Sequence, residues 1–247
     1  MATRLAGLSF FFPVYDEEDN LGPMVEEALA TLPRFADELE IIVVDDGSHD
    51  RTGAIADSLA AAHPSVRVVH HRPNRGYGAA LRSGFQASTM PFLFFTDGDR
   101  QFRLEDLGRL IGSLDRADAV IGYRLKRADP WRRLVISAVY NRIIRLLFGG
   151  NFRDVDCAFK LFRREVFSRV PLERIRSNGA FFSPELLLTL RAAGVPMHQV
   201  GIPHYPRVAQ EPKGAPVRVI LRAMRDLVQL RLRLWRVGLL RGRAGSR

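Results

Sequence analysis

The sequence is poor in cysteine, in lysine and in long apolar runs. Its one cysteine, Cys157, excludes an internal disulfide framework and fits a reducing compartment. No stretch approaches the ~18 uncharged apolar residues that a membrane span requires. The apolar run near the N-terminus is broken by Pro13 and lacks the cleavage pattern of a signal peptide. We therefore expect a protein that is made and kept in the cytoplasm.

Positive charge comes almost entirely from arginine. Only three of the 37 basic residues are lysines, and the formal net charge is +10. The guanidinium group matches phosphate geometry better than a lysine ammonium does. The balance favours an anionic partner, which leaves nucleotides, phospholipid surfaces and nucleic acid open. With 247 residues, 47% of them hydrophobic, the chain can bury a substantial core.

The first half alternates between two kinds of pattern. Short apolar runs typical of buried strands occupy residues 8–14, 40–44, 66–70 and 91–95, and helical spacing occupies 20–32, 52–62 and 78–87. Strands that alternate with helices predict right-handed βαβ units and a parallel sheet covered on both faces. The fold class is therefore α/β.

Polar residues follow three of these strands, at 13–20, 45–50 and 97–101. Because ligands of open α/β sheets bind beyond the carboxyl ends of the strands, we expect these segments to meet in one cleft.

Asp97 and Asp99 are the most specific feature of this cleft. Alternate residues at the end of a strand can aim two carboxylates at one point, and hard cations such as Mg²⁺ or Mn²⁺ take such oxygens together with substrate phosphates. The alternative is ordinary turn chemistry, since Asp-Gly is a common turn dipeptide. Asp45 and Asp46 leave a similar choice between binding base or ribose donors and capping the next helix.

Two loops offer further phosphate partners. The glycine-rich turn at 74–80 opens a helix but is not a dinucleotide fingerprint, so by itself it has no weight. A proline-rich loop at 203–216 has three candidate phosphate partners, His204, Arg207 and Lys213, although a solvated loop is the default interpretation.

The second half has two long helical patterns, 131–148 and about 217–240. Between them we expect a strand near 159–162, a helix at 184–193 and a strand at 195–202. In the C-terminal pattern, arginines gather within roughly an 80° arc opposite apolar residues that include Val228 and Trp235. Such a helix either packs on the core with a solvated basic face or lies on an anionic membrane.

Several stretches together resemble one family. They are FFPVYDEEDNL, IIVVDDGSHDRT, NRGYGAALRSGF, FFTDGDRQFRLEDL, VIGYR, RDVDCAFKLFRREVF, ELLLTLRAAG and HYPRVAQEPKG. The chain resembles family 2 inverting glycosyltransferases of the GT-A fold, in the dolichyl- and polyprenyl-phosphate mannosyl- and glucosyltransferase branch. The resemblance implies a Rossmann-like, mostly parallel sheet flanked by helices. It also implies a catalytic domain at 1–215, divided near 122 into nucleotide and acceptor halves, and a basic amphipathic helical tail at 216–247.

The resemblance also implies roles for individual residues. The implied metal ligands, for Mg²⁺ or Mn²⁺, are Asp97, Asp99 and Gln101. The other implied donor-binding residues are Pro13, Tyr15, Glu17, Val43, Asp45, Gly98, Arg124, Arg207 and Lys213. Of these sets, Asp99, Arg124 and Arg207 are the expected catalytic residues, and the acceptor candidates are Arg142, Arg153, Asp154 and Asp156. Two departures are Cys157-Ala158-Phe159, where the family has Cys/Ser-Gly-Phe, and the lack of the two C-terminal membrane spans of many bacterial members.

The expected reaction is inverting transfer of mannose or glucose from a donor of the GDP-mannose or UDP-glucose class to a polyprenyl or dolichyl phosphate. The enzyme would lie peripherally on the anionic cytoplasmic face of the membrane. A same-fold enzyme acting on a soluble or polysaccharide hydroxyl is the alternative, with Asp154, Asp156 or Glu185 as general base. A nucleic-acid-binding module is disfavoured because acidic strand ends repel phosphate backbones, and a non-catalytic nucleotide-sugar sensor is disfavoured by the intact acidic pair.

Overall fold

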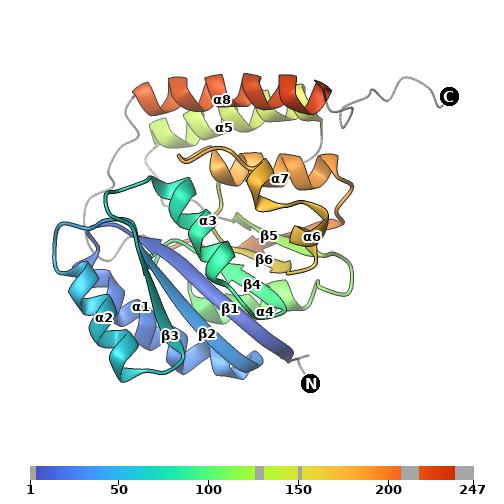
Figure 1. The fold of residues 1–247 in the computed structure, drawn as a ribbon. Helices are drawn as coiled ribbons and strands as arrows, with labels where there is room; N and C mark the ends of the chain where they lie inside the picture. Colours follow the sequence, from blue (N-terminus) through green and yellow to red (C-terminus); the bar gives the residue numbers. More distant parts are fainter. Residues whose placement is uncertain (1–3, 126–130, 150–151, 207–216, 237–247) are drawn as a thin grey trace.

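The computed structural model describes residues 4–125, 131–149, 152–206 and 217–236 (Figure 1). Seven strands form one sheet in the order β3-β2-β1-β4-β6-β5-β7. They are β1 (Leu5–Val14), β2 (Ala36–Asp45), β3 (Val66–His70), β4 (Phe92–Phe95), β5 (Ala119–Arg124), β6 (Lys160–Arg163) and β7 (Met197–Ile202). Only β6 runs antiparallel to its neighbours, so the predicted parallel α/β sheet is confirmed with one reversed strand.

Helices cover both faces of the sheet (Figure 1). The α-helices are α1 (Glu18–Thr31), α2 (Thr52–Ala62), α3 (Tyr77–Ala87), α4 (Leu107–Ile111), α5 (Trp131–Phe148), α6 (Val166–Arg169), α7 (Phe182–Ala192) and α8 (Val217–Arg236). Three short 3-10 turns lie at Leu32–Arg34, Leu104–Asp106 and Leu172–Arg174. Side chains alternate across β1: Phe11 packs into one core cluster, and Phe10 and Phe12 pack into the other.

Helix α3 lies directly on the sheet because Gly84 has no side chain. A Cβ atom at Gly84 would come 2.2 Å from Cδ2 of Phe11 in β1. The helical pattern predicted at 78–87 is thus confirmed, and its glycine is a close-packing residue rather than a weak point in the helix.

One buried carboxylate, Glu40, joins β2 to β1. Ser9 donates a hydrogen bond of 2.5 Å to Oε1 of Glu40, and the Thr89 hydroxyl donates another of 2.9 Å. Burial opposes the charge of Glu40, but these hydrogen bonds and Arg67 outweigh it and hold its pKa below the usual range.

Helices α5 and α8 lie side by side on the outside of the molecule, beyond α7 (Figure 1). Leu227, Leu230 and Leu234 bury one face of α8 against the core. Arg233 of α8 also donates a hydrogen bond of 2.7 Å to the buried Glu185 of α7. None of the helices that the structure describes is long and apolar enough to cross a bilayer.

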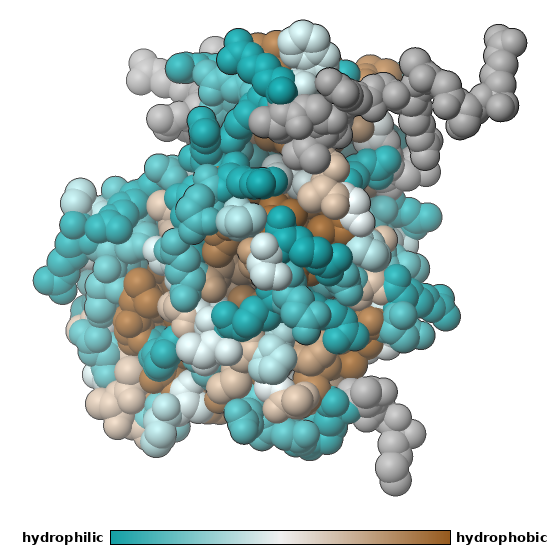
Figure 2. Space-filling view, turned by 45° about the vertical axis from the view of Figure 1, so that its right-hand side comes forward, coloured by the Kyte–Doolittle hydropathy of each residue, from teal (hydrophilic) through white to brown (hydrophobic). Residues whose placement is uncertain are grey.

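The apolar side predicted for α8 is divided in the structure. Leu227 is buried, but Val228 and Trp235 are exposed at 51% and 66%. Leu146 of α5 is exposed at 75%. Apolar and hydrophilic atoms consequently alternate on the surface at the top of the molecule (Figure 2).

Candidate active site

The carboxyl ends of the six parallel strands lie at one edge of the sheet, as predicted. The loop after β1 joins the loop after β2 there: the Asp16 backbone N–H donates to Ser48 Oγ at 3.0 Å, and the His49 N–H donates to the Asp16 carboxylate at 2.7 Å. The loop after β4 joins the segment after β7 through the Tyr205 N–H and the Gln101 carbonyl, at 2.9 Å.

Asp97 and Asp99 occupy the centre of this edge. The Asp97 carboxylate accepts a hydrogen bond of 2.7 Å from the Tyr77 hydroxyl, and Asp99 accepts one of 3.2 Å from the Gln101 N–H. Burial, and then repulsion by the Asp99 carboxylate, raise the pKa of Asp97 above its usual range. Arg100, between them and Gln101, has a φ of 57°, a left-handed conformation that costs a non-glycine residue about 1 kcal/mol or more. A turn is therefore present, and it brings two carboxylates together at the cost of mutual repulsion.

Gln101 follows the acidic pair on the same turn. Its side-chain amide nitrogen donates to the Tyr205 carbonyl at 3.1 Å, so Oε1 is the amide atom left for other partners. Gly98 allows this turn to pass close to β1, because a Cβ there would lie 3.0 Å from the Pro13 carbonyl oxygen.

These residues fit a divalent cation. Two carboxylates and an amide oxygen are hard oxygen donors, and a cation would relieve the repulsion between Asp97 and Asp99. In the part of the chain that the structure describes, no cluster of three or more His, Cys, Asp or Glu side chains could hold a metal by itself. A cation here would thus need ligands from the substrate, as Mg²⁺ usually does.

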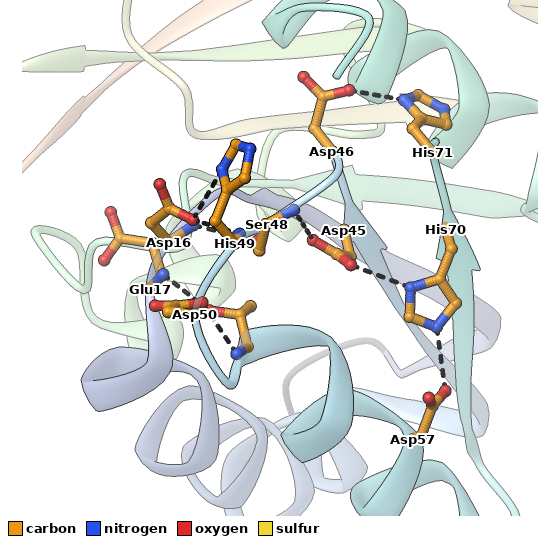
Figure 3. Close-up of polar contacts among 11 residues, drawn as sticks. Asp16, Glu17, Asp45, Asp46, Ser48, His49, Asp50, Asp57, His70 and His71 are labelled. Atoms are coloured by element: carbon orange, nitrogen blue, oxygen red, sulfur yellow. Dashed lines mark hydrogen bonds and ion pairs between the residues drawn. The ribbon is translucent and has the colours of Figure 1, made fainter. Parts of the chain in front are cut away.

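Asp45 lies at the end of β2 with only 5% of its surface exposed (Figure 3). Its carboxylate accepts the Ser48 N–H and contacts His70 Nδ1, each at 2.9 Å. His70 also contacts Asp57 at 2.9 Å. The hydrogen bond to the Asp57 carboxylate is the largest influence on the pKa of His70 and raises it, although burial acts in the opposite direction. The cluster therefore holds the Asp45 side chain in one orientation.

Asp46 binds a different segment of the chain from Asp45. It contacts His71 Nδ1 at 2.6 Å and accepts the N–H groups of Arg75 and Gly76, each at 2.9 Å (Figure 3). It thereby anchors the glycine-rich turn that opens α3. Neither aspartate caps α2, because Asp50 accepts the N–H of Thr52, the first residue of this helix, at 2.9 Å, so the capping interpretation of this pair is wrong.

The remaining donor-side residues surround these loops. Tyr15 contacts His49 through its hydroxyl at 3.1 Å, and the Glu17 carboxylate accepts a hydrogen bond from Asn20 at 2.6 Å. Val43 is fully buried inside the sheet, where its side chain packs in the core. Arg207 and Lys213 lie outside the described residues.

Arg124, at the end of β5, forms a two-pronged ion pair with Asp154. Its Nε and Nη2 donate to the two carboxylate oxygens at 2.6 and 2.8 Å, and the side chains are exposed by only 12% and 7%. Burial opposes the charge of Arg124, but the Asp154 carboxylate outweighs it and raises the pKa of the guanidinium group. Both oxygens of Asp154 are therefore bound to a permanent cation.

The loop before β6 rests on buried polar contacts that the sequence did not reveal. Lys160 is fully buried, and its ammonium group donates to the Cys157 carbonyl and, at 2.8 Å, to Ser183 Oγ. Burial lowers the pKa of Lys160. No composition or spacing signal distinguishes such a lysine from a surface one.

The other acceptor candidates lie nearer the surface. Arg153 donates to the Tyr123 hydroxyl at 2.5 Å and stacks over that ring at 4.6 Å. Asp156 is exposed on the same loop, and Arg142 is exposed on α5. The loop and α5 are joined at Asn141, whose side-chain oxygen accepts the Val155 N–H at 3.3 Å.

Comparison with known proteins adds family and fold. A family model described as Glycosyl transferase family 2 matches residues 9–170. The chain is 36% identical over 201 residues to a polyprenol monophosphomannose synthase of Mycolicibacterium smegmatis, covering 77% of this chain and 74% of that protein. It is 32% identical over 244 residues to glycosyltransferase AglD of Haloferax volcanii, covering 95% of this chain but only 38% of that protein.

A solved structure shares the fold. Glucosyl-3-phosphoglycerate synthase of Mycobacterium tuberculosis, in complex with Mn²⁺ and UDP-glucose, superposes with a TM-score of 0.67 at 21% identity, covering 90% of this chain and 79% of that one. The match shows that the chain has the GT-A fold.

Proposed function

The chain belongs to glycosyltransferase family 2, and on that premise we propose that it transfers a hexose from a nucleoside diphosphate sugar to a polyprenyl phosphate at a membrane surface. It is a glycosyltransferase with a GT-A fold. The nucleotide half is residues 1–122 and the acceptor half is residues 123–215. The proposed donors are of the GDP-mannose or UDP-glucose class.

Asp45 and the loop at 13–17 would bind the nucleoside, and the segment 97–101 would receive the diphosphate. A divalent cation held by Asp97, Asp99 and the Gln101 amide oxygen would stabilise the charge that develops on the departing diphosphate. Arg207 and Lys213 are proposed to complete the phosphate contacts. The name of the mycobacterial relative, a polyprenol monophosphomannose synthase, supports a lipid phosphate acceptor.

The Arg124–Asp154 pair is the observation that carries the choice of acceptor. A sugar hydroxyl needs a general base. The buried carboxylates in the described part of the acceptor half are already engaged: Asp154 by Arg124 at 2.6 and 2.8 Å, and Glu185 by Arg233 at 2.7 Å and the Ser177 N–H at 2.8 Å. A phosphate monoester, with a second pKa of about 6, is already largely ionised at neutral pH. Its oxygen would form the bond to the anomeric carbon as the bond to the diphosphate breaks, which inverts that carbon and requires no proton transfer.

The exposed faces of α5 and α8 suit a membrane surface. Exposed apolar side chains there are Val139, Leu146, Val228, Leu232 and Trp235. Exposed arginines beside them are Arg142, Arg145, Arg225 and Arg236. Apolar side chains can enter the acyl boundary while arginines contact anionic headgroups, each worth about 1 kcal/mol. We propose that this surface holds the enzyme peripherally on the cytoplasmic face.

Product analysis tests the proposal. Purified protein with Mg²⁺ or Mn²⁺ is given GDP-mannose or UDP-glucose, together with either a polyprenyl phosphate in vesicles or soluble sugar acceptors. We expect labelled lipid-linked hexose, and labelled soluble product instead would refute the assignment of a lipid phosphate acceptor.

Replacing the exposed Asp156 with Asn should lower kcat less than ~3-fold, whereas loss of a general base at this position would lower kcat about 10²-fold or more.

A further inference from the structure

Tyr77 is the first residue of α3, and its hydroxyl contacts one carboxylate of the acidic pair. The phenol donates to Oδ1 of Asp97 at 2.7 Å. A phenol keeps its proton at neutral pH and so can donate this hydrogen bond.

The position of Tyr77 is determined by close backbone packing. Gly76, which precedes it, has a φ of 94°, and a Cβ there would lie 2.5 Å from the Asn178 carbonyl oxygen. The Gly78 N–H donates to the same oxygen at 2.9 Å. Arg82, one turn along α3, donates to the Asn178 side chain at 2.8 Å. The start of α3 is therefore fixed against the 175–181 loop by Gly76, Gly78 and Arg82.

The hydrogen bond makes the two oxygens of Asp97 unequal. Oδ1 shares a lone pair with the phenol, and Oδ2 remains the stronger donor atom toward a cation. Asp99 also accepts a hydrogen bond on Oδ1, from the Gln101 N–H at 3.2 Å. The hydrogen bond from Tyr77 therefore favours one oxygen of Asp97 over the other as a metal ligand.

Coordination chemistry connects this arrangement with metal choice. Mg²⁺ and Mn²⁺ favour six oxygens with single-oxygen carboxylate contacts, whereas Ca²⁺ takes six to eight and accepts two oxygens from one carboxylate. Hydrogen-bonded partners of metal ligands change metal affinity about 10- to 100-fold when they are removed.

We propose that Tyr77 is a positioning residue that orients Asp97 for one-oxygen coordination and so makes the site select Mg²⁺ or Mn²⁺ over Ca²⁺. The inference rests on the proposed function, because it takes Asp97 and Asp99 as the metal-binding pair. It assigns a role to the glycine-rich turn, which otherwise has no part in the reaction.

Tyr77→Phe tests this role, since it removes one hydroxyl and keeps the ring. Binding of Mn²⁺ in the presence of UDP or GDP is followed by electron paramagnetic resonance, and Ca²⁺ is measured by its displacement of Mn²⁺. We expect Mn²⁺ affinity to fall about 10-fold and the preference for Mn²⁺ over Ca²⁺ to narrow. Tyr140→Phe is the matched control, because that phenol packs on α5 against the core and should leave both quantities unchanged.

The outcomes separate the two proposals. If the unmodified protein binds no Mn²⁺ with either nucleotide, the metal assignment of the proposed function fails and Tyr77 loses its role with it. If the unmodified protein binds Mn²⁺ and Tyr77→Phe leaves affinity and selectivity unchanged, only the Tyr77 proposal is overturned. A fall in Mn²⁺ and Ca²⁺ affinity by the same factor, with a lowered metal-free Tm, would show a merely structural role and also overturn it.

Discussion

Breaking the Arg124–Asp154 pair should destabilise the fold strongly when one partner is removed and weakly when both are replaced. With exposures of 12% and 7%, neither charge can recover much hydration after its partner is lost. Removing one member of a buried ion pair costs about 3–5 kcal/mol. Arg124→Met leaves the Asp154 carboxylate buried without the Arg124 charge, and we expect a cost of about 3 kcal/mol for this variant. For a chain of this size that corresponds to a fall in Tm of roughly 6–12 °C.

The double variant is the decisive measurement. Arg124→Met combined with Asp154→Leu removes both charges and fills the space with apolar atoms, which is often neutral. We expect the double variant to be more stable than the sum of the single effects by at least about 2 kcal/mol. Urea unfolding followed by circular dichroism gives the free energies of all four proteins. Additivity within about 0.5 kcal/mol would refute the reasoning, because it would mean that the two charges do not depend on each other.

Other predictions concern different parts of the molecule. Asp99→Ala should lower kcat at least about 10²-fold without changing the circular dichroism spectrum, and near-normal turnover would refute the metal assignment. Glu40→Gln should cost about 1–2 kcal/mol at pH 7. Because the folded pKa of Glu40 lies below the usual 4.5, this stabilisation is complete above pH 4.5 and is lost as the pH falls through the folded pKa. The difference in Tm between the variant and the unmodified protein should therefore disappear in acid, and a difference that stays constant with pH would contradict the prediction. Gly84→Ala, stabilising in most helices, should here lower Tm, because the new methyl group meets the Phe11 ring at 2.2 Å. Leu232→Glu should weaken sedimentation with anionic vesicles about 10-fold relative to Arg109→Gln on α4, a control on the opposite face, and equal binding would remove α8 from the membrane surface.

Local pattern was sufficient to predict most elements. The four N-terminal strands and the helices between them were predicted within a few residues. Strands β1, β2 and β4 are largely buried and read as continuous apolar runs, whereas the edge strand β3 is mostly of intermediate exposure. The direction of β6 was not predictable in this way, since four residues, KLFR, carry no information about which neighbours they join. The short helices α4 and α6 were also missed, because each has too few residues for a periodic pattern.

The candidate site also has residues that the sequence predicted and contacts that it did not. Asp97 and Asp99 could be placed in the cleft because they follow a strand directly in the chain. Partners from distant segments fix some acids of the site: Tyr77 reaches Asp97 from α3, and Arg124 reaches Asp154 across 30 residues. Such partners depend on tertiary packing, and for that reason the sequence indicated the acids but not what orients them.

The reversed direction of β6 affects how this enzyme could diversify. In the parallel strands, the segment that leaves the strand lies at the edge of the sheet that carries the candidate site, whereas in β6 it is the segment that enters. The stretch from Phe152 to Phe159 therefore ends on a strand anchored by the buried Lys160, between Phe95 and Ile121. If the proposed function holds, exchange of this stretch between homologous enzymes should alter acceptor choice while the loops after β1, β2 and β4 remain intact. Swapped chimaeras of these eight or so residues offer a direct route to new acceptors on an unchanged sugar-donor site.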